Sequence, residues 1–368
     1  MIYISVLKID LNAIVENIKG YKSKIKDTQK FCAVVKADAY GLGAKKICKE
    51  IDYLVDYFAV SSEKEFFEIK EKVSKPIIIL DPIYENITKL ARCDCEFCVS
   101  NFLQFDLILK LAEENKDVNF KIHVAFNTGM NRFGFRKIED VINVFNCVKK
   151  TQNVFIFGVI SHFYCGNIEN FVKLQSRKFE YLKLALEEKF DVSNVIFHIA
   201  NTSGFEREKE FDMFRIGLGL FCNNNNQAFS IESKIIEIQE VKSGECVGYG
   251  YCYFADKKMK VGVVGIGYAD GVLRKIAKRG YVLVNEKYCL VLAVCMDSII
   301  IDLGDSNAKI GDTVTLVGKN GEKQIFICDC ARWCDTIEYE IMTRISKRVK
   351  RVYIGGKINA NHNRKISC

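Results

Sequence analysis

The sequence predicts an α/β protein: a (β/α)8 TIM barrel followed by a C-terminal, mainly-β domain. Three observations favour this architecture. Eight short apolar runs alternate with amphipathic stretches between residues 31 and 220, as expected for a barrel. From residue 229 onward, apolar runs follow one another with short Gly, Asn and Asp turns and almost no long helix. A chain of 368 residues is also long enough to bury a large core and a smaller one.

The chain opens with an apolar run over residues 1–9, which predicts a strand. Asp10 follows as a candidate N-cap for a helix over residues 11–25, where apolar residues recur at helical spacing. A barrel made from residues 31–220 has no place for the first run, so we expect that run to join the β domain. The predicted domains are the barrel, residues 10–224, and the β domain, residues 225–368 with residues 1–9.

Barrel strands are predicted at residues 31–35, 57–60, 76–80, 96–99, 120–126, 154–161, 195–200 and 214–220. A doubly wound open sheet is the alternative, but no Gly-x-Gly-x-x-Gly follows the first of these runs. Barrel enzymes place their chemistry at the carboxyl ends of the strands. The residues found at those ends are therefore candidates for a site: Lys36, Ser61, Asp81, Ser100, Asn127, His162, Asn201 and Arg215.

The second half of the chain predicts a small β domain with one short helix. Its strands are expected at residues 233–240, 260–266, 281–284, 290–294, 298–303 and 313–317, and its helix at residues 328–334. Four asparagines at residues 223–226 form a polar break, which is typical of a linker between domains.

Composition excludes several classes of function. The net charge of +8 is spread along the chain rather than clustered with aromatics, which argues against nucleic-acid binding. No signal peptide and no run long enough to cross a membrane is evident, so we expect a cytoplasmic protein whose 16 cysteines are reduced. Two groups of three cysteines, at residues 93–98 and 328–334, have spacings unlike a zinc ribbon, so no metal is expected.

The most informative stretch is residues 35–43, Val-Lys-Ala-Asp-Ala-Tyr-Gly-Leu-Gly. It places a single lysine, Lys36, where a buried apolar run ends and a glycine-containing turn begins. A lysine at such a place can act as a nucleophile, as a base or as the covalent partner of an aldehyde cofactor. The alternative is a lysine that only extends to solvent from a strand end.

This stretch closely resembles the pyridoxal-phosphate lysine motif of alanine racemases (fold type III). Further segments match that family in order: Thr-Gly-Met-Asn-Arg-Phe-Gly at residues 128–134, Ser-His-Phe at 161–163, His-Ile-Ala-Asn-Thr at 198–202, Arg-Ile-Gly at 215–217, Gly-Tyr-Gly at 248–250, Gly-Ile-Gly-Tyr-Ala-Asp-Gly at 265–271 and Cys-Met-Asp at 295–297. Each segment alone is weak. Together they cover the chain from about residue 8 to residue 353.

The resemblance implies a pyridoxal 5'-phosphate-dependent racemase that interconverts L- and D-alanine and supplies D-alanine for cell-wall peptidoglycan. It implies a homodimer with shared active sites, in which Lys36 and Tyr249 of the neighbouring subunit are the two bases. His162, linked to Arg215, would favour the phenolate of Tyr249, and Arg215 would face the cofactor ring nitrogen. The remaining roles that the resemblance implies are phosphate or cofactor contacts for Tyr40, Thr202, Gly217 and Leu218, and substrate contacts for Arg132, Met296 and Tyr268.

Three positions depart from the family pattern and leave the substrate open. Leu42 stands where the family usually has His, Ala125 where several members have a lysine, and Lys347 where most have a tyrosine. A racemase for serine or another amino acid is therefore the nearest alternative. A fold type III decarboxylase and a pyridoxal-phosphate carrier without turnover are less favoured. His123 and His198, inside apolar strands, are interpreted as core histidines.

Overall fold

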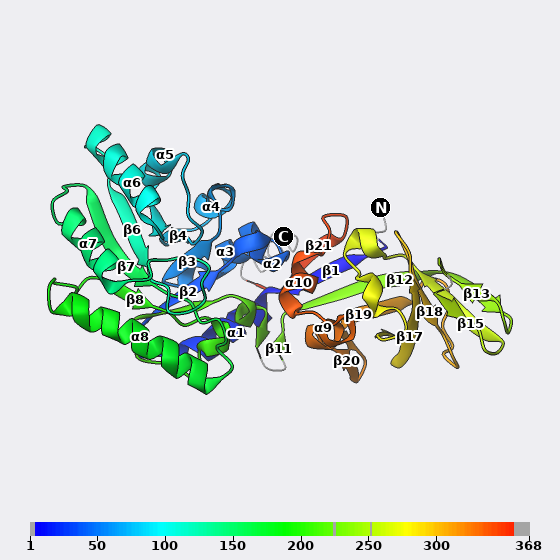
Figure 1. The fold of residues 1–368 in the computed structure, drawn as a ribbon. Helices are drawn as coiled ribbons and strands as arrows, with labels where there is room; N and C mark the ends of the chain where they lie inside the picture. Colours follow the sequence, from blue (N-terminus) through cyan, green and yellow to red (C-terminus); the bar gives the residue numbers. More distant parts are fainter. Residues whose placement is uncertain (1–3, 224–225, 251, 357–368) are drawn as a thin grey trace. The chain divides into compact units, whose positions relative to one another are not determined.

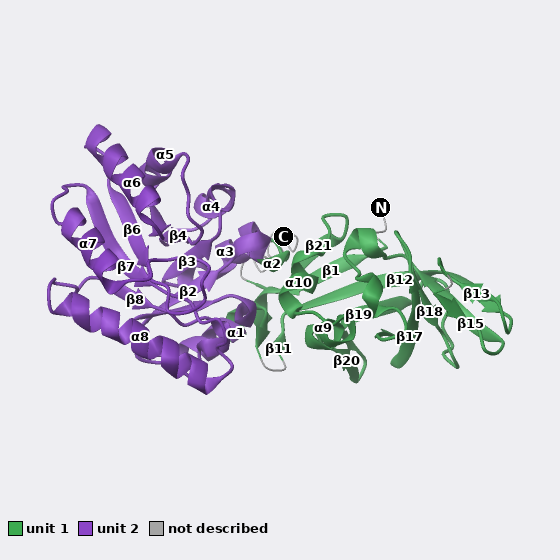
Figure 2. Ribbon diagram, in the orientation of Figure 1, with its two compact units in different colours: residues 1–16, 40–43, 221–368 green, residues 17–39, 44–220 purple. Residues whose placement is uncertain are grey.

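The computed structural model describes residues 4–223, 226–250 and 252–356, and the chain divides into two compact units (Figure 2). One unit holds residues 17–39 and 44–220, and the other holds residues 1–16, 40–43 and 221–368. The predicted linker at residues 223–226 and the start of the first predicted strand lie partly outside the described residues. Each unit is described by itself below.

The first unit is a nearly closed barrel of eight parallel strands (Figure 1). Their order is β8-β7-β6-β5-β4-β3-β2-β9, so the first barrel strand pairs with the last. The strands are β2 (Lys30–Val34), β3 (Tyr57–Val60), β4 (Ile77–Ile79), β5 (Cys95–Val99), β6 (Phe120–Ala125), β7 (Val154–Ile160), β8 (Ile196–His198) and β9 (Met213–Ile216). The eight strands confirm the barrel that the sequence predicts.

Backbone contacts bring β8 and β9 together, although no ladder joins them. Asn201 and Arg215 form an isolated parallel bridge, and the Arg215 N–H donates to the Ala200 carbonyl at 3.1 Å. This bridge places the ends of β8 and β9, where several candidate site residues lie, beside each other.

Helices cover the outer face of the barrel, as Figure 1 shows. They are α1 (Leu11–Lys22), α3 (Ala44–Ile51), α4 (Glu63–Lys70), α5 (Ile87–Arg92), α6 (Phe102–Glu114), α7 (Ile138–Val148) and α8 (Glu169–Glu187). Asp10 caps α1 as predicted, because its carboxylate accepts hydrogen bonds from the N–H groups of Asn12 and Ala13. Asn101 caps α6 in the same way.

The barrel interior is filled by alternate residues of the strands, mostly apolar ones such as Val34, Ala59, Ile78 and Ile160. Short 3-10 turns connect some of the elements: η1 (Asp52–Leu54) follows α3, η2 (Thr202–Gly204) follows β8, and η3 (Leu218–Leu220) follows β9. Four polar residues share this interior and are almost completely buried: Glu96, His123, His198 and Arg215.

The second unit is built on a nine-stranded sheet of order β20-β19-β16-β17-β18-β15-β12-β1-β21. Its strands are β1 (Val6–Asp10), β12 (Phe229–Val241), β15 (Met259–Val264), β16 (Tyr281–Val284), β17 (Lys287–Val294), β18 (Ile299–Asp302), β19 (Thr313–Asn320), β20 (Lys323–Ile325) and β21 (Lys350–Ile354). The amino-terminal strand β1 lies within this sheet, antiparallel to β12 and parallel to β21.

Shorter elements complete the second unit. They are the two-residue strands β10 (Cys222–Asn223), β11 (Asn226–Gln227), β13 (Cys246–Val247) and β14 (Tyr253–Phe254), the 3-10 turns η4 (Tyr268–Asp270) and η5 (Arg274–Ile276), and helices α9 (Ile327–Cys334) and α10 (Glu338–Thr343). Helix α9 was predicted, whereas α10 and β21 were not. Among the described residues, no helix combines the length and the apolar character needed to span a membrane.

Candidate active site

Lys36 begins a tight left-handed turn, α2 (Lys36–Tyr40), directly after the end of β2. The four residues after it, Ala37 to Tyr40, have φ angles between 52° and 56°. Residues with a Cβ avoid this conformation, which costs roughly 1–2 kcal/mol each. The side chain of Lys36 is partly buried. The turn is therefore held in an unfavourable backbone conformation at the residue that the sequence marks for chemistry.

Two carboxylates hold the start and the end of this turn. Glu65 accepts a hydrogen bond from the Ala37 N–H at 2.8 Å with one oxygen and from the Ser61 N–H at 2.7 Å with the other. Asp38 accepts one from the Ala44 N–H at 2.8 Å. These bonds offset part of the strain and tie Lys36 to the ends of β2 and β3.

Residues 40–43 belong to the second unit, where β21 holds them. The Arg351 guanidinium donates to the Gly41 carbonyl at 2.9 Å, and the Tyr353 hydroxyl donates to the Leu42 carbonyl at 2.9 Å. A Cβ on Gly43, whose φ is +100°, would lie 1.8 Å from the Tyr353 oxygen. The predicted cofactor residue Tyr40 is buried in the same unit. Sequence reasoning missed Arg351 and Tyr353, because the cationic run around them resembles a solvated surface.

Arg215 is the centre of the polar group inside the barrel. Its guanidinium donates to His198 Nδ1 at 2.8 Å, to His162 Nδ1 at 3.2 Å, and to the backbone carbonyls of Ser161, His198 and Ile199 at 2.6, 3.0 and 3.3 Å. Burial lowers its pKa to about 10, which the thiols of Cys32 and Cys98 partly oppose. Arg215 therefore stays charged at neutral pH.

His162 lies between Arg215 and Asn201. Burial lowers the pKa of His162 well below its usual value, and the charges of Arg215, Arg132 and Lys36 lower it further. A donor faces each ring nitrogen of His162, because Arg215 Nη2 is 3.2 Å from Nδ1 and Asn201 Nδ2 is 3.1 Å from Nε2. A neutral imidazole has one acceptor nitrogen and one N–H, so it accepts only one of these two hydrogen bonds. The structure thus brings four predicted site residues into one electrostatic group, Lys36, Arg132, His162 and Arg215.

A set of hydrogen-bond donors lies where β8 and β9 end. The Thr202 hydroxyl accepts hydrogen bonds from the N–H groups of Gly217 at 3.0 Å and Gly219 at 3.4 Å. Leu218, between them, is the first residue of η3. Hydroxyls and clustered backbone amides are the groups that bind phosphate oxygens in proteins. Of the predicted phosphate contacts, Thr202, Gly217 and Leu218 therefore lie together, and Tyr40 belongs to the other unit.

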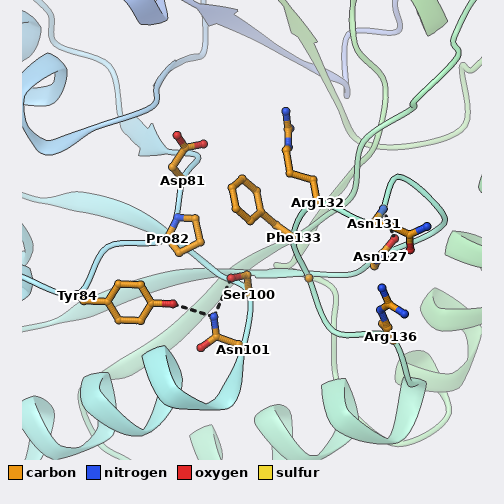
Figure 3. Close-up of a pocket in the computed structure, with 11 residues that line it drawn as sticks. Asp81, Pro82, Tyr84, Ser100, Asn101, Asn127, Asn131, Arg132, Phe133 and Arg136 are labelled. Atoms are coloured by element: carbon orange, nitrogen blue, oxygen red, sulfur yellow. Dashed lines mark hydrogen bonds between the residues drawn. The ribbon is translucent and has the colours of Figure 1, made fainter.

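A pocket of about 510 Å³ opens at the ends of β4, β5 and β6 (Figure 3). Its walls include the predicted strand-end residues Asp81, Ser100 and Asn127, with Arg132 and Arg136. Asn127 shapes the loop that carries Arg132, because its side-chain oxygen accepts hydrogen bonds from the N–H groups of Gly129 and Asn131. The Arg132 side chain is exposed, and Figure 3 shows it extending away from Arg136, on the side of the pocket where Asp81 lies.

The same loop is anchored beside His162. The hydroxyls of Thr128 and Ser161 are 2.8 Å apart, and Gln175 donates to both the Thr128 hydroxyl and the His162 carbonyl. The position of Arg132 is therefore coupled, through this loop, to the strand end that carries His162.

The β unit carries the other candidate residues in two places. Tyr249, between Gly248 and Gly250, is 76% exposed and lines a cavity of about 240 Å³ with Cys252, Arg274 and Lys275. Tyr268 and Met296 lie together, because the Tyr268 N–H donates to the Cys295 carbonyl and the Ala269 N–H to the Met296 carbonyl. Asp270 supports this second place by accepting from the Gly267 N–H at 2.9 Å.

The two cysteine groups show no metal geometry in the part of the chain that the structure describes, since no three metal-ligating side chains converge there. Burial raises the pKa of the Cys98 thiol to about 12, as expected of an inert core cysteine.

Comparison with known proteins identifies the family to which the chain is similar. Residues 9–225 match the model of the alanine racemase N-terminal domain, and residues 228–353 match that of the C-terminal domain. The alanine racemase of Ligilactobacillus salivarius is 34% identical in an alignment that covers 94% of this chain and 96% of that protein.

Solved structures agree. Alanine racemase from E. faecalis superposes with a TM-score of 0.89 at 27% identity, over 96% of this chain and 98% of that one. Alanine racemase from Bartonella henselae, which contains covalently bound pyridoxal phosphate, shares the fold with a TM-score of 0.86 at 24% identity, over 96% of this chain and all of that one. With both domains matched in order, the chain belongs to the alanine racemase family, whose members are isomerases.

Proposed function

We propose that this protein interconverts L- and D-alanine with pyridoxal 5'-phosphate as cofactor, by a two-base mechanism. The observation that carries the proposal is the group at the carboxyl ends of the barrel strands: Lys36 at the start of a constrained turn, with the charges of Arg132 and Arg215 acting on His162. Family membership supports alanine as substrate.

The residues present fit the cofactor. Lys36 would hold it covalently, and the Thr202 hydroxyl with the N–H groups of Gly217 and Leu218 would bind its phosphate, assisted by Tyr40. A buried guanidinium that remains charged, as Arg215 does, suits an unprotonated ring nitrogen. When bound, the cofactor delocalises the charge that remains on the substrate after its α proton is removed.

Two bases are needed on opposite faces of the substrate, because racemisation removes the proton from one face and returns it on the other. The Lys36 amine would serve one face. The phenol of Tyr249, contributed by the partner subunit, would serve the other, consistent with its exposure of 76% in the single chain. A neutral His162 has one ring N–H, which would donate a hydrogen bond to the phenolate oxygen.

Arg132 would bind the substrate carboxylate through its planar guanidinium, and Met296 and Tyr268 would complete the substrate site from the β unit. The product, D-alanine, would serve cell-wall peptidoglycan, as in the family. Cytoplasmic location and the homodimer remain predictions of the sequence.

Arg215 also weighs against the decarboxylase alternative, because decarboxylases favour an acidic group that protonates the ring nitrogen. A carrier without turnover would not need the β unit with Tyr249, so the presence of that unit weighs against a carrier too. A serine racemase differs from the proposal only in its substrate.

The test is exchange of the α proton in heavy water with a panel of L- and D-amino acids. We expect both alanine enantiomers to exchange and racemise fastest, and Lys36→Ala to abolish exchange. If another amino acid is turned over faster than alanine, that amino acid is the substrate. If CO2 is released, the protein is a decarboxylase.

A further inference from the structure

Arg215 carries a buried charge without a carboxylate beside it. Within the described residues its hydrogen bonds go to two imidazoles and three backbone carbonyls, and none goes to an acidic side chain. Burying a charge without an opposite charge is costly. The barrel interior does contain one carboxylate, that of Glu96 on β5, whose residue is 1% exposed.

An unbroken series of buried hydrogen bonds joins the two charges. Arg215 Nη1 is 2.8 Å from His198 Nδ1, His198 Nε2 is 2.9 Å from His123 Nδ1, and His123 Nε2 is 2.7 Å from Glu96 Oε2. Both imidazoles are fully buried. We call these four residues the Glu96 relay.

The hydrogen-bond donors in this relay can point in one direction only. A guanidinium has no acceptor, so Nδ1 of His198 must be the bare nitrogen and Nε2 must carry the proton. His198 is neutral, since burial lowers its pKa well below the usual value, as does the charge of Arg215. His198 therefore donates to His123 Nδ1, which leaves the His123 proton on Nε2, facing Glu96. Every donor points toward the carboxylate.

The fold makes room for the relay at one glycine. His123 on β6 pairs with Gly158 on β7, and His198 lies on β8, the next strand. A Cβ at residue 158 would lie 2.3 Å from His123 Nδ1. The absence of a side chain at Gly158 therefore lets the His123 ring reach across β7 to His198.

We propose that Glu96 is a positioning residue for Arg215. Its carboxylate accepts the last N–H of the series, so it holds His123 and His198 in the orientation that the guanidinium requires, and its charge stabilises the buried cation. The consequence for catalysis rests on the proposed function, whereas the protonation pattern of the relay does not.

The first measurement reads the relay directly by NMR of the full-length protein labelled with [15N]histidine. The chain has only 4 histidines, so the imidazole signals are few. We expect His123 and His198 to be neutral and protonated on Nε2. A proton on His198 Nδ1 would overturn the proposal, and this result does not depend on any enzymatic activity.

Variants at residue 96 then test whether the carboxylate reaches His198. Glu96→Leu removes the acceptor, so the His198 signals should change, whereas Glu96→Gln retains an acceptor and should keep the wild-type tautomers. Glu208→Gln is the matched control: Glu208 is another buried, hydrogen-bonded carboxylate of the same unit, outside the relay. Unchanged His198 signals in Glu96→Leu would overturn the proposal.

The kinetic consequence separates positioning from a purely structural role. Glu96→Leu should lower kcat for alanine about tenfold, which is the lower end of the loss seen when outer partners of metal ligands are removed. The KM should change little, and the absorbance of bound pyridoxal phosphate should shift. Glu96→Gln should lower kcat less than Glu96→Leu does, and Glu208→Gln should match wild type.

If Glu96→Leu fails to fold, the histidine NMR spectrum of the wild type and the kcat and absorbance of Glu96→Gln test the proposal. Equal kcat and absorbance in Glu96→Gln, Glu208→Gln and wild type would show that Glu96 only fills the barrel. A wild-type enzyme inactive toward alanine would instead overturn the proposed function, while the NMR result would still stand.

Discussion

At the scale of single residues, Tyr249 offers the sharpest test of the two-base proposal. Tyr249→Phe removes only the hydroxyl, so cofactor binding should persist. Exchange of the α proton should fall by about 10²–10⁴ from one enantiomer and far less from the other. The measurement is exchange in heavy water from each pure enantiomer. Tyr253→Phe is the control, a second tyrosine of the same segment, in β14. If exchange falls only slightly, and equally from L- and D-alanine, Tyr249 has only a structural role.

Lys347 is the departure from the family pattern that bears most on substrate choice. It is exposed, as are its neighbours Arg348 and Lys350. A flexible cationic chain excludes a slightly larger substrate less well than a rigid ring, so we expect alanine to be the best substrate with measurable serine turnover. One added hydroxyl is worth roughly a hundredfold at most in such a pocket. Lys347→Tyr should raise the alanine-to-serine ratio of kcat/KM, with Lys350→Tyr as the control. If the ratio is unchanged and the wild-type enzyme does not turn over serine, Lys347 plays no part in the choice of substrate.

The buried histidines predict how stability depends on pH. The pKa values of His162 and His198 are lowered well below 6.5, mainly by burial. Below about pH 6.5 the unfolded chain binds protons that the folded chain does not, so stability is retained above that pH and lost as the pH falls. Each imidazole should contribute up to about 1.4 kcal/mol per pH unit.

Urea unfolding at fixed protein concentration, between about pH 7 and pH 5, measures this slope. Replacing His162 with Gln removes one of the two groups, so the variant should show a shallower slope. The same slope in the variant would mean that His162 is already protonated in the folded protein.

At the scale of elements, the left-handed turn after Lys36 predicts an unusual effect of glycine. Ala37 is exposed and has a φ of 52°. Ala37→Gly relieves about 1–2 kcal/mol of backbone strain and adds about 0.5–1 kcal/mol of chain entropy cost. The free energy of unfolding should therefore rise by about 0.5–1 kcal/mol, as measured by denaturant unfolding.

Ala185 in the right-handed helix α8 provides the matched control. There, Ala→Gly should lower the free energy of unfolding by about 1 kcal/mol. Destabilisation by both substitutions would show that the turn after Lys36 is not strained in solution.

The elements also show what a sequence can and cannot reveal. The eight barrel strands were predictable because each is a buried apolar run. Lys36 and His162 could be singled out because they follow such runs, whereas Arg215 lies inside β9 and was singled out by its place in a family motif. Strand β21 was missed, since its cations suggested a solvated surface. The left-handed turn was missed because alanine and aspartate have no strong preference for that conformation.

The Glu96 relay was missed for a different reason. Glu96, His123 and His198 are single polar residues in three apolar strands, and each alone is typical of a satisfied core residue. Their meeting depends on the register of β5 to β8 and on the missing side chain at Gly158. A polar residue at an interior position of several neighbouring strands is the one signal that could have indicated the relay.

At the scale of the whole molecule, the two candidate bases belong to different compact units of the chain, Lys36 to the barrel and Tyr249 to the β unit. The proposed function joins the barrel of one subunit to the β unit of its partner. Activity should then require the dimer, and each dimer should contain two sites that use residues of both chains.

Mixing two inactive variants tests this arrangement. In a heterodimer of Lys36→Ala and Tyr249→Phe chains, one site combines both substitutions and the other has both native residues. If the subunits exchange at random, half of the dimers are heterodimers with one intact site, so about a quarter of wild-type activity should return. The activity measured is racemisation, and the control is each variant incubated alone, which should racemise alanine far more slowly than the mixture. Subunit exchange, verified with differently tagged chains, without any return of activity would place both bases within a single chain.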